Sequence, residues 1–465
     1  MQTPHFDLAI IGAGTAGMSA YEAASRYLQR IAVIDPGPYG TLCARSGCMP
    51  SKLLVTAANA AHDARRASLF GVQTGDVWVD TPAVMRRVRE ERDRFVQSTA
   101  QTVNHWPRCT LIKGHARFTG SHRLMVDDRP VTADRFVVAT GAQAQVPHEW
   151  RDKLGDRLFT SDDVFEWPAL PHAVAVVGAG SIGLELAQAL HRLGVRVRVF
   201  DRGRTLGPLT DPVVQAEAAR LLGEELDLRL GAEILEVERT ADGVRVRVAV
   251  EGQIEDFEAD GLLAAMGREP VLQGLGLEHA GVAFDADGRP PLDPQTMRLG
   301  SSGIFVAGDA SGWRPLLHEA ALGGRIAGEN AAHYPDVVAY PRKSALNIVF
   351  CEPQMALAGQ THAELHKRLD AVAIGSSSWH DQGRARVMAQ AGGVLRMYAE
   401  RSSHVFLGAE LIGPRAEHLA HLLAWSAQQK LTVRQMLDCP VYHPVLEEGL
   451  RPALVELARE LGAFR

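Results

Sequence analysis

Two cysteines of this chain, Cys43 and Cys48, lie five positions apart and shortly after a glycine-rich turn. On a regular α-helix, Cα atoms five residues apart are about 8–9 Å from each other, whereas a disulfide joins Cα atoms about 4.4–6.8 Å apart. A bridge therefore requires the chain to leave the helix between them, which Gly47 permits. Pro50 suits the first turn of a helix that continues after it. Cys48 would then lie at a helix N-terminus, where the dipole favours a thiolate, and Cys43 would be the more approachable sulfur.

The cysteine spacing alone favours two reduced, buried thiols, and the surrounding sequence is what favours redox chemistry instead. Two stretches each consist of an expected strand, a Gly-x-Gly-x-x-Gly turn, an expected helix and a strand that ends in aspartate. Such glycines let the backbone approach a pyrophosphate at the helix N-terminus, while the acid accepts a hydrogen bond from a ribose hydroxyl. The interval from first glycine to acid is the same in both stretches, which indicates two dinucleotide sites. The residues are Gly12, Gly14, Gly17 and Asp35 in the first stretch, and Gly178, Gly180, Gly183 and Asp201 in the second.

Composition limits the classes of protein to consider. The chain has 465 residues, of which 46% are hydrophobic and 22% charged, with a formal net charge of −6. This balance argues against nucleic acid or anionic lipid as a partner. No apolar run reaches the length of a membrane span, and the first residues do not read as a targeting segment. Five scattered cysteines do not form the framework of a secreted protein, so we expect a cytoplasmic enzyme in which any disulfide is catalytic.

The order of expected elements predicts an α/β chain in four consecutive parts. Residues 1–147 contain the first dinucleotide unit, 148–264 the second, 265–340 return to the first domain, and 341–465 form a C-terminal domain. Helices are expected over 50–67, 82–104 and 319–332. In the last part we expect strands over 345–350, 371–379, 394–399 and 404–410, and helices over 416–429, 433–437 and 446–461.

The combination of these motifs closely resembles the class I pyridine nucleotide–disulfide oxidoreductases, and within them a divergent branch of the dihydrolipoamide dehydrogenases. The likeness covers nearly the whole chain, and the motifs occur in the same order as in the family. It implies two Rossmann-like domains, for FAD and for NAD, and a C-terminal α+β dimerisation domain. The residues that carry it are the two glycine turns, Cys43 and Cys48 with Pro50-Ser51-Lys52, Gly141, Glu185, Gly267, Asp309 and the segment from His443 to Glu448.

The resemblance also assigns cofactor-binding roles. Asp35 would bind the adenosine ribose of FAD, Asp309 its ribityl chain, and Gly141 and Gly267 would contribute to the cofactor sites. Lys52 would approach the reactive nitrogen of the flavin and be held there by Glu185. A cation beside that ring stabilises the anionic reduced form. An ordinary exposed lysine and an ordinary helix-surface glutamate are the structural alternatives for these two residues.

His443 is the expected catalytic base. A dithiol must lose a proton before it can attack a disulfide, and histidine titrates in the required range. Glu448 would orient the imidazole ring, and the family spacing His-Pro-x-x-x-Glu selects it over Glu447. In the family this histidine reaches the disulfide of a second subunit, so the resemblance implies a homodimer.

Nucleotide choice rests on Asp201 and Gly183, which favour NAD over NADP because a carboxylate repels a 2′-phosphate. Arg202 and Arg204 point the other way, since family members that use NADP carry arginines in this neighbourhood. No metal site is expected. Cys109, Cys351 and Cys439 are interpreted as structural.

The expected function is electron transfer from a dithiol, dihydrolipoamide or a protein-borne lipoyl group, through Cys43 and Cys48 and FAD to NAD⁺. A first alternative is an NAD(P)H-dependent reductase of another small disulfide, as in glutathione reductases. The replacements at Ala44 and Arg45 favour a divergent substrate, although Glu22 stands where glutathione reductases carry an arginine. A second alternative is a non-catalytic flavoprotein that serves as a binding subunit.

Overall fold

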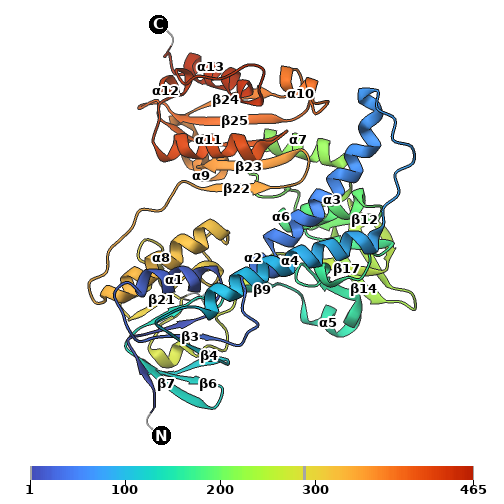
Figure 1. Cartoon of the computed structure of the whole chain (residues 1–465). Helices are drawn as coiled ribbons and strands as arrows, with labels where there is room; N and C mark the ends of the chain where they lie inside the picture. Colours follow the sequence, from blue (N-terminus) through green and yellow to red (C-terminus); the bar gives the residue numbers. More distant parts are fainter. Residues whose placement is uncertain (1–2, 286–289, 464–465) are drawn as a thin grey trace. The chain divides into compact units, whose positions relative to one another are not determined.

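The protein is described by a computed structural model that covers residues 3–285 and 290–463. The chain forms two compact units, labelled by element in Figure 1. Among the described residues, no helix combines the length and the apolarity that a membrane span requires. Unit 1 comprises Met1–Pro50, Val88–Gln145 and Arg268–Arg342, and unit 2 comprises Ser51–Arg87, Val146–Gly267 and Lys343–Arg465.

The centre of unit 1 is a seven-stranded sheet, in which the last five strands of the spatial order given below run parallel. Side chains of β2 alternate between its faces, as a strand buried on both sides requires. Leu8 and Ile10 pack against α1 (Thr15–Ala24) and α8 (Leu317–His333). Ala9 and Ile11 face a four-stranded sheet on the opposite side. The seven strands, in spatial order, are β19 (Leu292–Asp293), β20 (Arg298–Leu299), β21 (Ile304–Val306), β8 (Phe136–Val138), β2 (Leu8–Ile11), β3 (Ile31–Asp35) and β4 (Cys109–Lys113).

Smaller elements complete this unit. The covering sheet contains β1 (His5–Phe6), β7 (Arg129–Ala133), β6 (Arg123–Val126) and β5 (Ala116–Gly120). A two-stranded ribbon pairs β9 (Ala142–Ala144) with β18 (Arg268–Pro270). Two long helices, α3 (Cys48–Arg66) and α4 (Thr81–Asn104), each belong partly to unit 1 and partly to unit 2, and both match helices expected from sequence.

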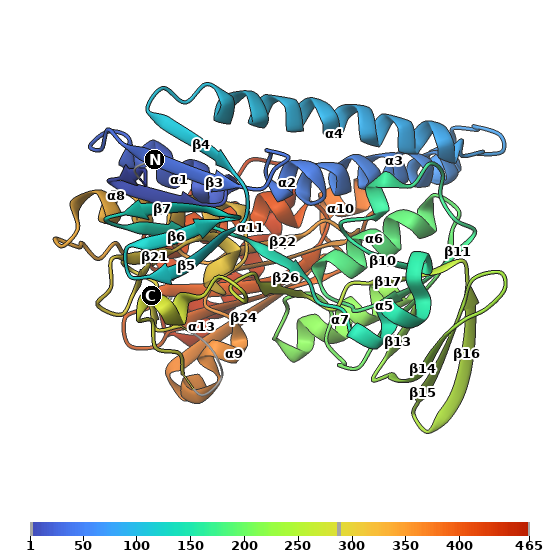
Figure 2. The same cartoon turned by 90° about the horizontal axis from the view of Figure 1, so that it is seen from below.

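Unit 2 contains a second parallel sheet of five strands. One of its faces packs against a three-stranded antiparallel sheet, which is labelled β14 (Glu233–Arg239), β15 (Val244–Val250) and β16 (Gln253–Ala259) in Figure 2. The helices of this region are α5 (His148–Leu154), α6 (Ser181–Arg192) and α7 (Pro212–Gly223). The parallel strands are β10 (Leu158–Thr160), β17 (Gly261–Ala264), β11 (Ala173–Val177), β12 (Arg196–Asp201) and β13 (Asp227–Leu230).

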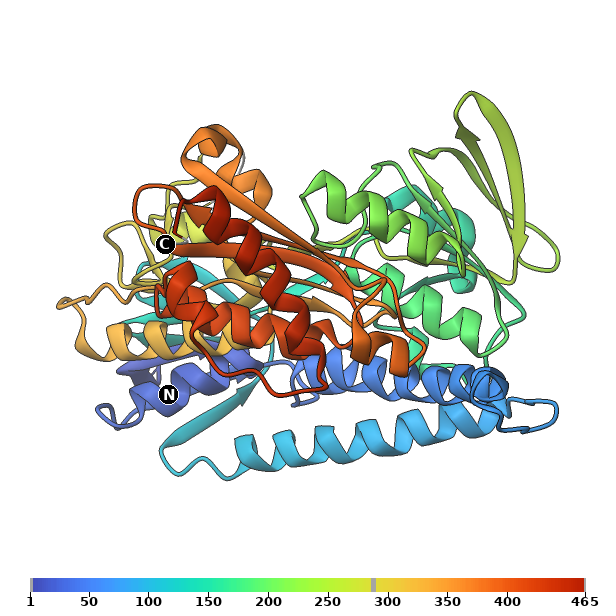
Figure 3. The same cartoon turned by 90° about the horizontal axis from the view of Figure 1, so that it is seen from above.

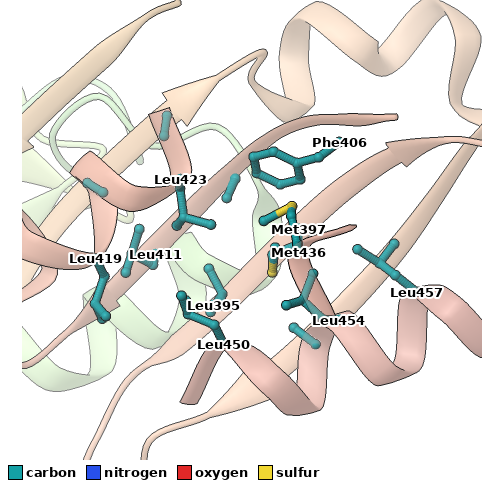
Figure 4. Close-up of a cluster of buried hydrophobic side chains, with 14 of the residues drawn as sticks. Leu395, Met397, Phe406, Leu411, Leu419, Leu423, Met436, Leu450, Leu454 and Leu457 are labelled. Carbon is teal, nitrogen blue, oxygen red and sulfur yellow. The ribbon is translucent and has the colours of Figure 1, made fainter. Parts of the chain in front are cut away.

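The C-terminal part of unit 2 is an antiparallel five-stranded sheet with helices on one face (Figure 3). Leu419 and Leu423 of α11 and Leu450, Leu454 and Leu457 of α13 point into its core, together with residues of the strands (Figure 4). The strands are β22 (Leu346–Val349), β23 (Gln354–Gly359), β26 (Phe406–Gly413), β25 (Val394–Glu400) and β24 (Val372–Ser378), and the helices are α9 (His362–Leu365), α10 (Gly383–Val387), α11 (Ala416–Gln428), α12 (Val433–Leu437) and α13 (Leu450–Glu460).

Two fully buried carboxylates tie this sheet to α7. Glu410 of β26 accepts hydrogen bonds from the backbone N–H groups of Asp211 and His362 and from the hydroxyl of Thr210. Asp211 caps α7 and accepts from the hydroxyl of Tyr398 at 2.9 Å. Buried charges persist only when they are paired in this way.

The architecture confirms the predicted fold class: two Rossmann-like sheets and a C-terminal α+β domain. The four predicted domain boundaries stay predictions. One predicted element list was incomplete, because β23 was not expected from sequence and lies in the middle of the C-terminal sheet.

Candidate active site

The segment around the two cysteines leaves the helix between them, as the spacing requires. A single turn, α2 (Leu42–Arg45), contains Cys43, and α3 begins at Cys48. The intervening Ser46 has φ −139°, which is not helical. A Cβ at Gly47 would lie 3.0 Å from the Cα of Cys43, so any larger residue would push the chain apart at this close approach. The Cys43 thiol thereby makes a hydrogen bond with the sulfur of Cys48.

The two sulfurs differ in their electrostatic surroundings. The hydrogen bond to Cys48, followed by burial, raises the pKa of the Cys43 thiol. Cys48 begins the 19-residue helix α3, whose dipole favours negative charge at that end. Cys43 is half-buried and Cys48 exposed, so the prediction that Cys43 would be the more approachable sulfur was wrong. Cys43 is the less exposed of the two because it lies beside the buried Ala44 and close to Gly47.

The first glycine turn has the shape that a dinucleotide requires. Gly12 has φ +106°, and a Cβ there would lie 2.3 Å from the carbonyl oxygen of Ala139. A Cβ at Gly17 would lie 1.9 Å from the carbonyl oxygen of Gly12. Gly14 differs, because an added Cβ would meet no described atom within 4 Å. Gly12 and Gly17 therefore allow the close backbone packing of the turn. Gly14 leaves open space before the N-terminus of α1, where a pyrophosphate fits.

The second glycine turn repeats this geometry. Gly178 has φ +115°, and a Cβ there would lie 2.3 Å from the carbonyl oxygen of Ala265. A Cβ at Gly183 would lie 1.9 Å from the carbonyl oxygen of Gly178, whereas one at Gly180 would meet nothing within 4 Å. Both turns therefore fit a dinucleotide in the same way.

Asp35 and Asp201, which end the strand that follows the helix after each glycine turn, have a role that the sequence did not indicate. Asp35 accepts hydrogen bonds from the N–H groups of Ala13 (2.8 Å) and Gly37 (2.7 Å). Asp201 accepts in the same way from the N–H groups of Ala179 and Gly203, at 2.6 Å each. Each carboxylate therefore fixes its own glycine turn, and its remaining lone pairs are available to a ribose.

Lys52 and Glu185 form an ion pair of 2.7 Å between α3 and α6. The Glu185 side chain is 7% exposed, and its second oxygen accepts from the N–H of Phe350 at 2.9 Å. The Lys52 ammonium also lies 4.5 Å from the centre of the Phe350 ring. The ammonium is thus fixed by a buried carboxylate and an aromatic face.

A polar seam centred on the buried Gln188 and Arg192, and completed by the half-buried Asn59, Glu225 and Glu352, continues the contact of α3 and α6 beyond this ion pair. Arg192 has a side chain that is 4% exposed and donates to the Asn59 amide oxygen at 2.8 Å. It also pairs with Glu225 (2.6 Å) and Glu352 (2.7 Å). Gln188 bonds the backbone N–H and C=O of Glu352. The seam sets the register of α3 on α6, and hence the position of Lys52.

Three further predicted cofactor residues lie at strand ends. Gly141 has φ +74° with open space at its Cβ position, and Gly267 has φ +106°. The Asp309 carboxyl accepts no hydrogen bond from the described residues, and burial raises its pKa while Arg268 acts in the opposite direction. A partly buried carboxyl with this surrounding fits a hydroxyl-bearing ligand.

His443 and Glu448 are in contact, in a different part of the chain from the cysteines. The Nδ1 atom of His443 lies 2.9 Å from Oε1 of Glu448, whose other oxygen accepts from the N–H of Val445. These two hydrogen bonds, that of His443 first, hold the pKa of Glu448 below its ordinary value. The imidazole is 81% exposed, so its other nitrogen is accessible. Glu447 makes no such contact with His443.

The other three cysteines occupy ordinary positions. Burial raises the pKa of Cys109 to about 12, and it also raises that of the buried Cys351. Cys439 is exposed and therefore not part of a core. Within the described residues, no three His, Cys, Asp or Glu side chains are arranged to hold a metal ion.

Comparison with known proteins agrees with this geometry. The family model "Pyridine nucleotide-disulphide oxidoreductase" matches residues 6–324, and the dimerisation domain of the same family matches residues 346–454. A dihydrolipoyl dehydrogenase of Chlamydia pneumoniae is 28% identical over 458 residues, covering 96% of this chain and 95% of the relative. A mercuric reductase of Acidithiobacillus ferrooxidans is 31% identical over 476 residues, covering 98% and 83%. The HOCl-induced flavoprotein disulfide reductase RclA of Escherichia coli has the same fold, with a TM-score of 0.81 at 23% identity over 97% of this chain and 99% of RclA.

Two substitutions in the second turn should separate nucleotide binding from folding. Gly180 has φ −74°, which alanine adopts readily, so Gly180→Ala should keep the fold and FAD. Its methyl group would fill the space for the pyrophosphate, so the Kd for NADH should rise about tenfold or more, equivalent to about 1.4 kcal/mol. Gly183→Ala should instead lower the melting temperature, because its Cβ meets the Gly178 carbonyl. Calorimetric titration with NADH, alongside thermal unfolding, measures both, and unchanged NADH binding by Gly180→Ala would contradict the assignment.

Proposed function

The chain belongs to the pyridine nucleotide-disulphide oxidoreductase family, and we propose that it transfers two electrons from a small dithiol, dihydrolipoamide or a related lipoyl group, to NAD⁺. One observation carries this proposal: the Cys43 thiol contacts the sulfur of Cys48 at the N-terminus of α3. Such a contact is what a reduced redox pair requires. The dihydrolipoyl dehydrogenases among its relatives support the choice of substrate.

FAD and NAD are the cofactors of this family. Their chemistry, when they are bound, is two-electron transfer from the reduced cysteine pair to the nicotinamide ring. The first glycine turn, Asp35, Asp309 and Gly141 would hold FAD, with Lys52 fixed by Glu185 beside its ring. The second glycine turn and Asp201 would hold NAD, with Gly267 in the loop after the adjoining strand.

The cysteines would act in a defined order. A substrate thiolate attacks the sulfur of Cys43, the Cys43–Cys48 bond breaks, and Cys48 leaves as a thiolate. The second substrate thiolate then attacks the first substrate sulfur, the cyclic disulfide forms, and Cys43 is released. The substrate loses two electrons and two protons; one proton ends on Cys43 and the other passes through His443 to solvent. The hydrogen bond between the Cys43 thiol and the Cys48 sulfur supports this final state.

The direction of this exchange follows from the two sulfurs. In thiol–disulfide exchange, the thiol of lower pKa is the better leaving group. The helix dipole at Cys48 favours its thiolate, and the hydrogen bond that raises the pKa of Cys43 is the one its thiol makes to the Cys48 sulfur. Cys48 is therefore the leaving sulfur, and Cys43 is the one attacked even though it is the less exposed of the two.

His443 would accept the proton of the substrate thiol. Its Nδ1 is held by Glu448, which leaves the accessible Nε2 for the substrate. Because the pKa of Glu448 is lowered, its carboxylate stays ionised through the neutral range and stabilises the imidazolium. The exposure of His443, together with the family's dimerisation domain over residues 346–454, supports a homodimer in which each His443 serves the cysteine pair of the partner.

NAD rather than NADP is the proposed acceptor. Asp201 places a carboxylate at the turn where a 2′-phosphate would have to bind, and like charges repel. Arg202 and Arg204 are exposed, and Arg204 lies 3.6 Å from Glu251, so its charge is partly satisfied.

A second candidate is an NAD(P)H-dependent reductase of another small disulfide. The relatives include a mercuric reductase, and the structure is similar to that of the disulfide reductase RclA. These likenesses and the cysteine segment support this second reaction. Arg45, the second residue after Cys43, donates to the carbonyl of Pro38 at 3.0 Å, which orients its side chain. The complete set of Cys43, Cys48, His443 and Glu448 argues against a non-catalytic binding subunit.

The substrate assignment is tested by parallel steady-state assays of the FAD-loaded protein. We expect turnover with dihydrolipoamide and NAD⁺, and much weaker turnover with glutathione disulfide and NADPH. The reverse order would reject the dithiol dehydrogenase in favour of the second candidate. No turnover with either pair, in a protein that binds FAD, would reject both.

The proton-transfer role is tested by His443→Gln. Loss of a positioned base typically costs about 10²–10⁴-fold in rate, so dithiol-dependent turnover should fall within that range while FAD binding is retained. His421→Gln, an exposed histidine on α11, serves as the matched control and should keep the wild-type rate. A near-normal rate for His443→Gln would show that another group takes the proton.

A further inference from the structure

A cavity of about 300 Å³ lies in the C-terminal part of unit 2, beside the segment that carries His443. Its size is at the lower end of the range for small-ligand pockets. The family likeness and the predicted site residues assign nothing to it. It is lined by Arg384, Met388, Arg415, His418, Leu419, Val445, Leu446 and Glu447.

The cavity has a cationic wall built from α10 and the N-terminal end of α11. Arg384 comes from α10, Arg415 precedes α11, and His418 lies in its first turn. In the part of the chain that the structure describes, neither guanidinium makes a hydrogen bond or an ion pair. Glu447 is the one carboxylate among the lining residues, and His418 lies 3.7 Å from Glu417 outside the lining. Arginine stays charged at any physiological pH, so positive charge prevails here.

Val445 connects the cavity to the proposed base. Val445 lines the cavity, and its N–H donates to Glu448, which in turn holds His443. The side-chain amide of Gln382, which caps α10, donates to the carbonyl of Val445 at 2.7 Å. Gln382 therefore joins the helix that carries Arg384 to the segment that carries the base.

We propose that this cavity, through Arg384 and Arg415, is a subsite for a carboxylate on the substrate, so that the preferred substrate is an anionic dithiol. The inference rests on the proposed function and narrows its substrate class. Two guanidinium groups that have no partner of their own suit a carboxylate, because each offers paired N–H donors in a planar fork. A substrate could then place its sulfurs at His443 and the carboxylate at the end of its chain between Arg384 and Arg415.

The test compares two substrates of one skeleton, dihydrolipoate with its carboxylate and the neutral dihydrolipoamide, each with NAD⁺. The wild-type FAD enzyme should show a lower KM for dihydrolipoate. Arg384→Ala and Arg415→Ala should each raise that KM about threefold to tenfold, as expected for a partly solvated charge pair, and leave the KM for dihydrolipoamide unchanged. Arg386→Ala, on the same short helix but outside the cavity, is the matched control.

A substitution of opposite sign sharpens this test. Glu447→Gln removes the one carboxylate of the lining, so it should lower the KM for dihydrolipoate while the arginine variants raise it. The difference between the two substrates should also shrink as salt is added. Equal changes for both substrates, or no change for either, would overturn the subsite. A defect confined to a protein-borne lipoyl substrate would also overturn it, in favour of an acidic protein surface.

A binding measurement separates this inference from the proposed function. Calorimetric titration with lipoate and lipoamide needs no turnover, so it remains informative if neither dithiol is oxidised. Lipoate should bind more tightly than lipoamide to the wild-type protein, and the Arg384→Ala/Arg415→Ala double variant should lose that preference. Equal affinities for the two ligands in the wild-type protein would reject the subsite, whereas absent dithiol turnover would reject the function alone.

Discussion

The break in the helix between Cys43 and Cys48 is the constraint on which the proposed chemistry depends. A continuous helix would hold these residues too far apart for a disulfide. The approach at Gly47 brings them into hydrogen-bond contact, and the restart of the helix at Cys48 places one sulfur at a positive dipole end. One local distortion thus creates both the contact and the difference between the two sulfurs that gives the exchange its direction.

Unit 2 supports other groups that the proposed chemistry uses. The ion pair of Lys52 with Glu185 and the polar seam around Arg192 fix α3 on α6 along its length. The buried Glu410 and Asp211 fix α7 on the C-terminal sheet, which carries the His443 segment. Each of these contacts includes a buried and fully paired charged side chain, so it favours one arrangement of side chains over others.

Features encoded within a few residues could be predicted from the sequence. The glycine turns, the helix interruption and the contact of His443 with Glu448 each depend on local spacing, and the structure contains all three. The strand β23 was missed because every residue from Gln354 to Gly359 is buried, so it shows no alternation of polar and apolar side chains. Arg192 and the cavity with Arg384 and Arg415 depend on segments far apart in the sequence, and no motif marks them. The relative exposure of Cys43 and Cys48 was predicted wrongly because packing around a single helical turn decides it.

The central claim is that Cys43 and Cys48 exchange between a disulfide and a thiol pair during turnover. Thiol titration of the denatured protein, freed of small molecules by anaerobic gel filtration, tests it directly, before and after anaerobic addition of one equivalent of dihydrolipoamide to the FAD-loaded oxidised protein. We predict two fewer reactive thiols than the five cysteines of the chain before addition, all five afterwards, and a peptide map that links Cys43 to Cys48 only in the oxidised sample. Five reactive thiols in both samples, or a disulfide that involves Cys109, Cys351 or Cys439, would contradict the account.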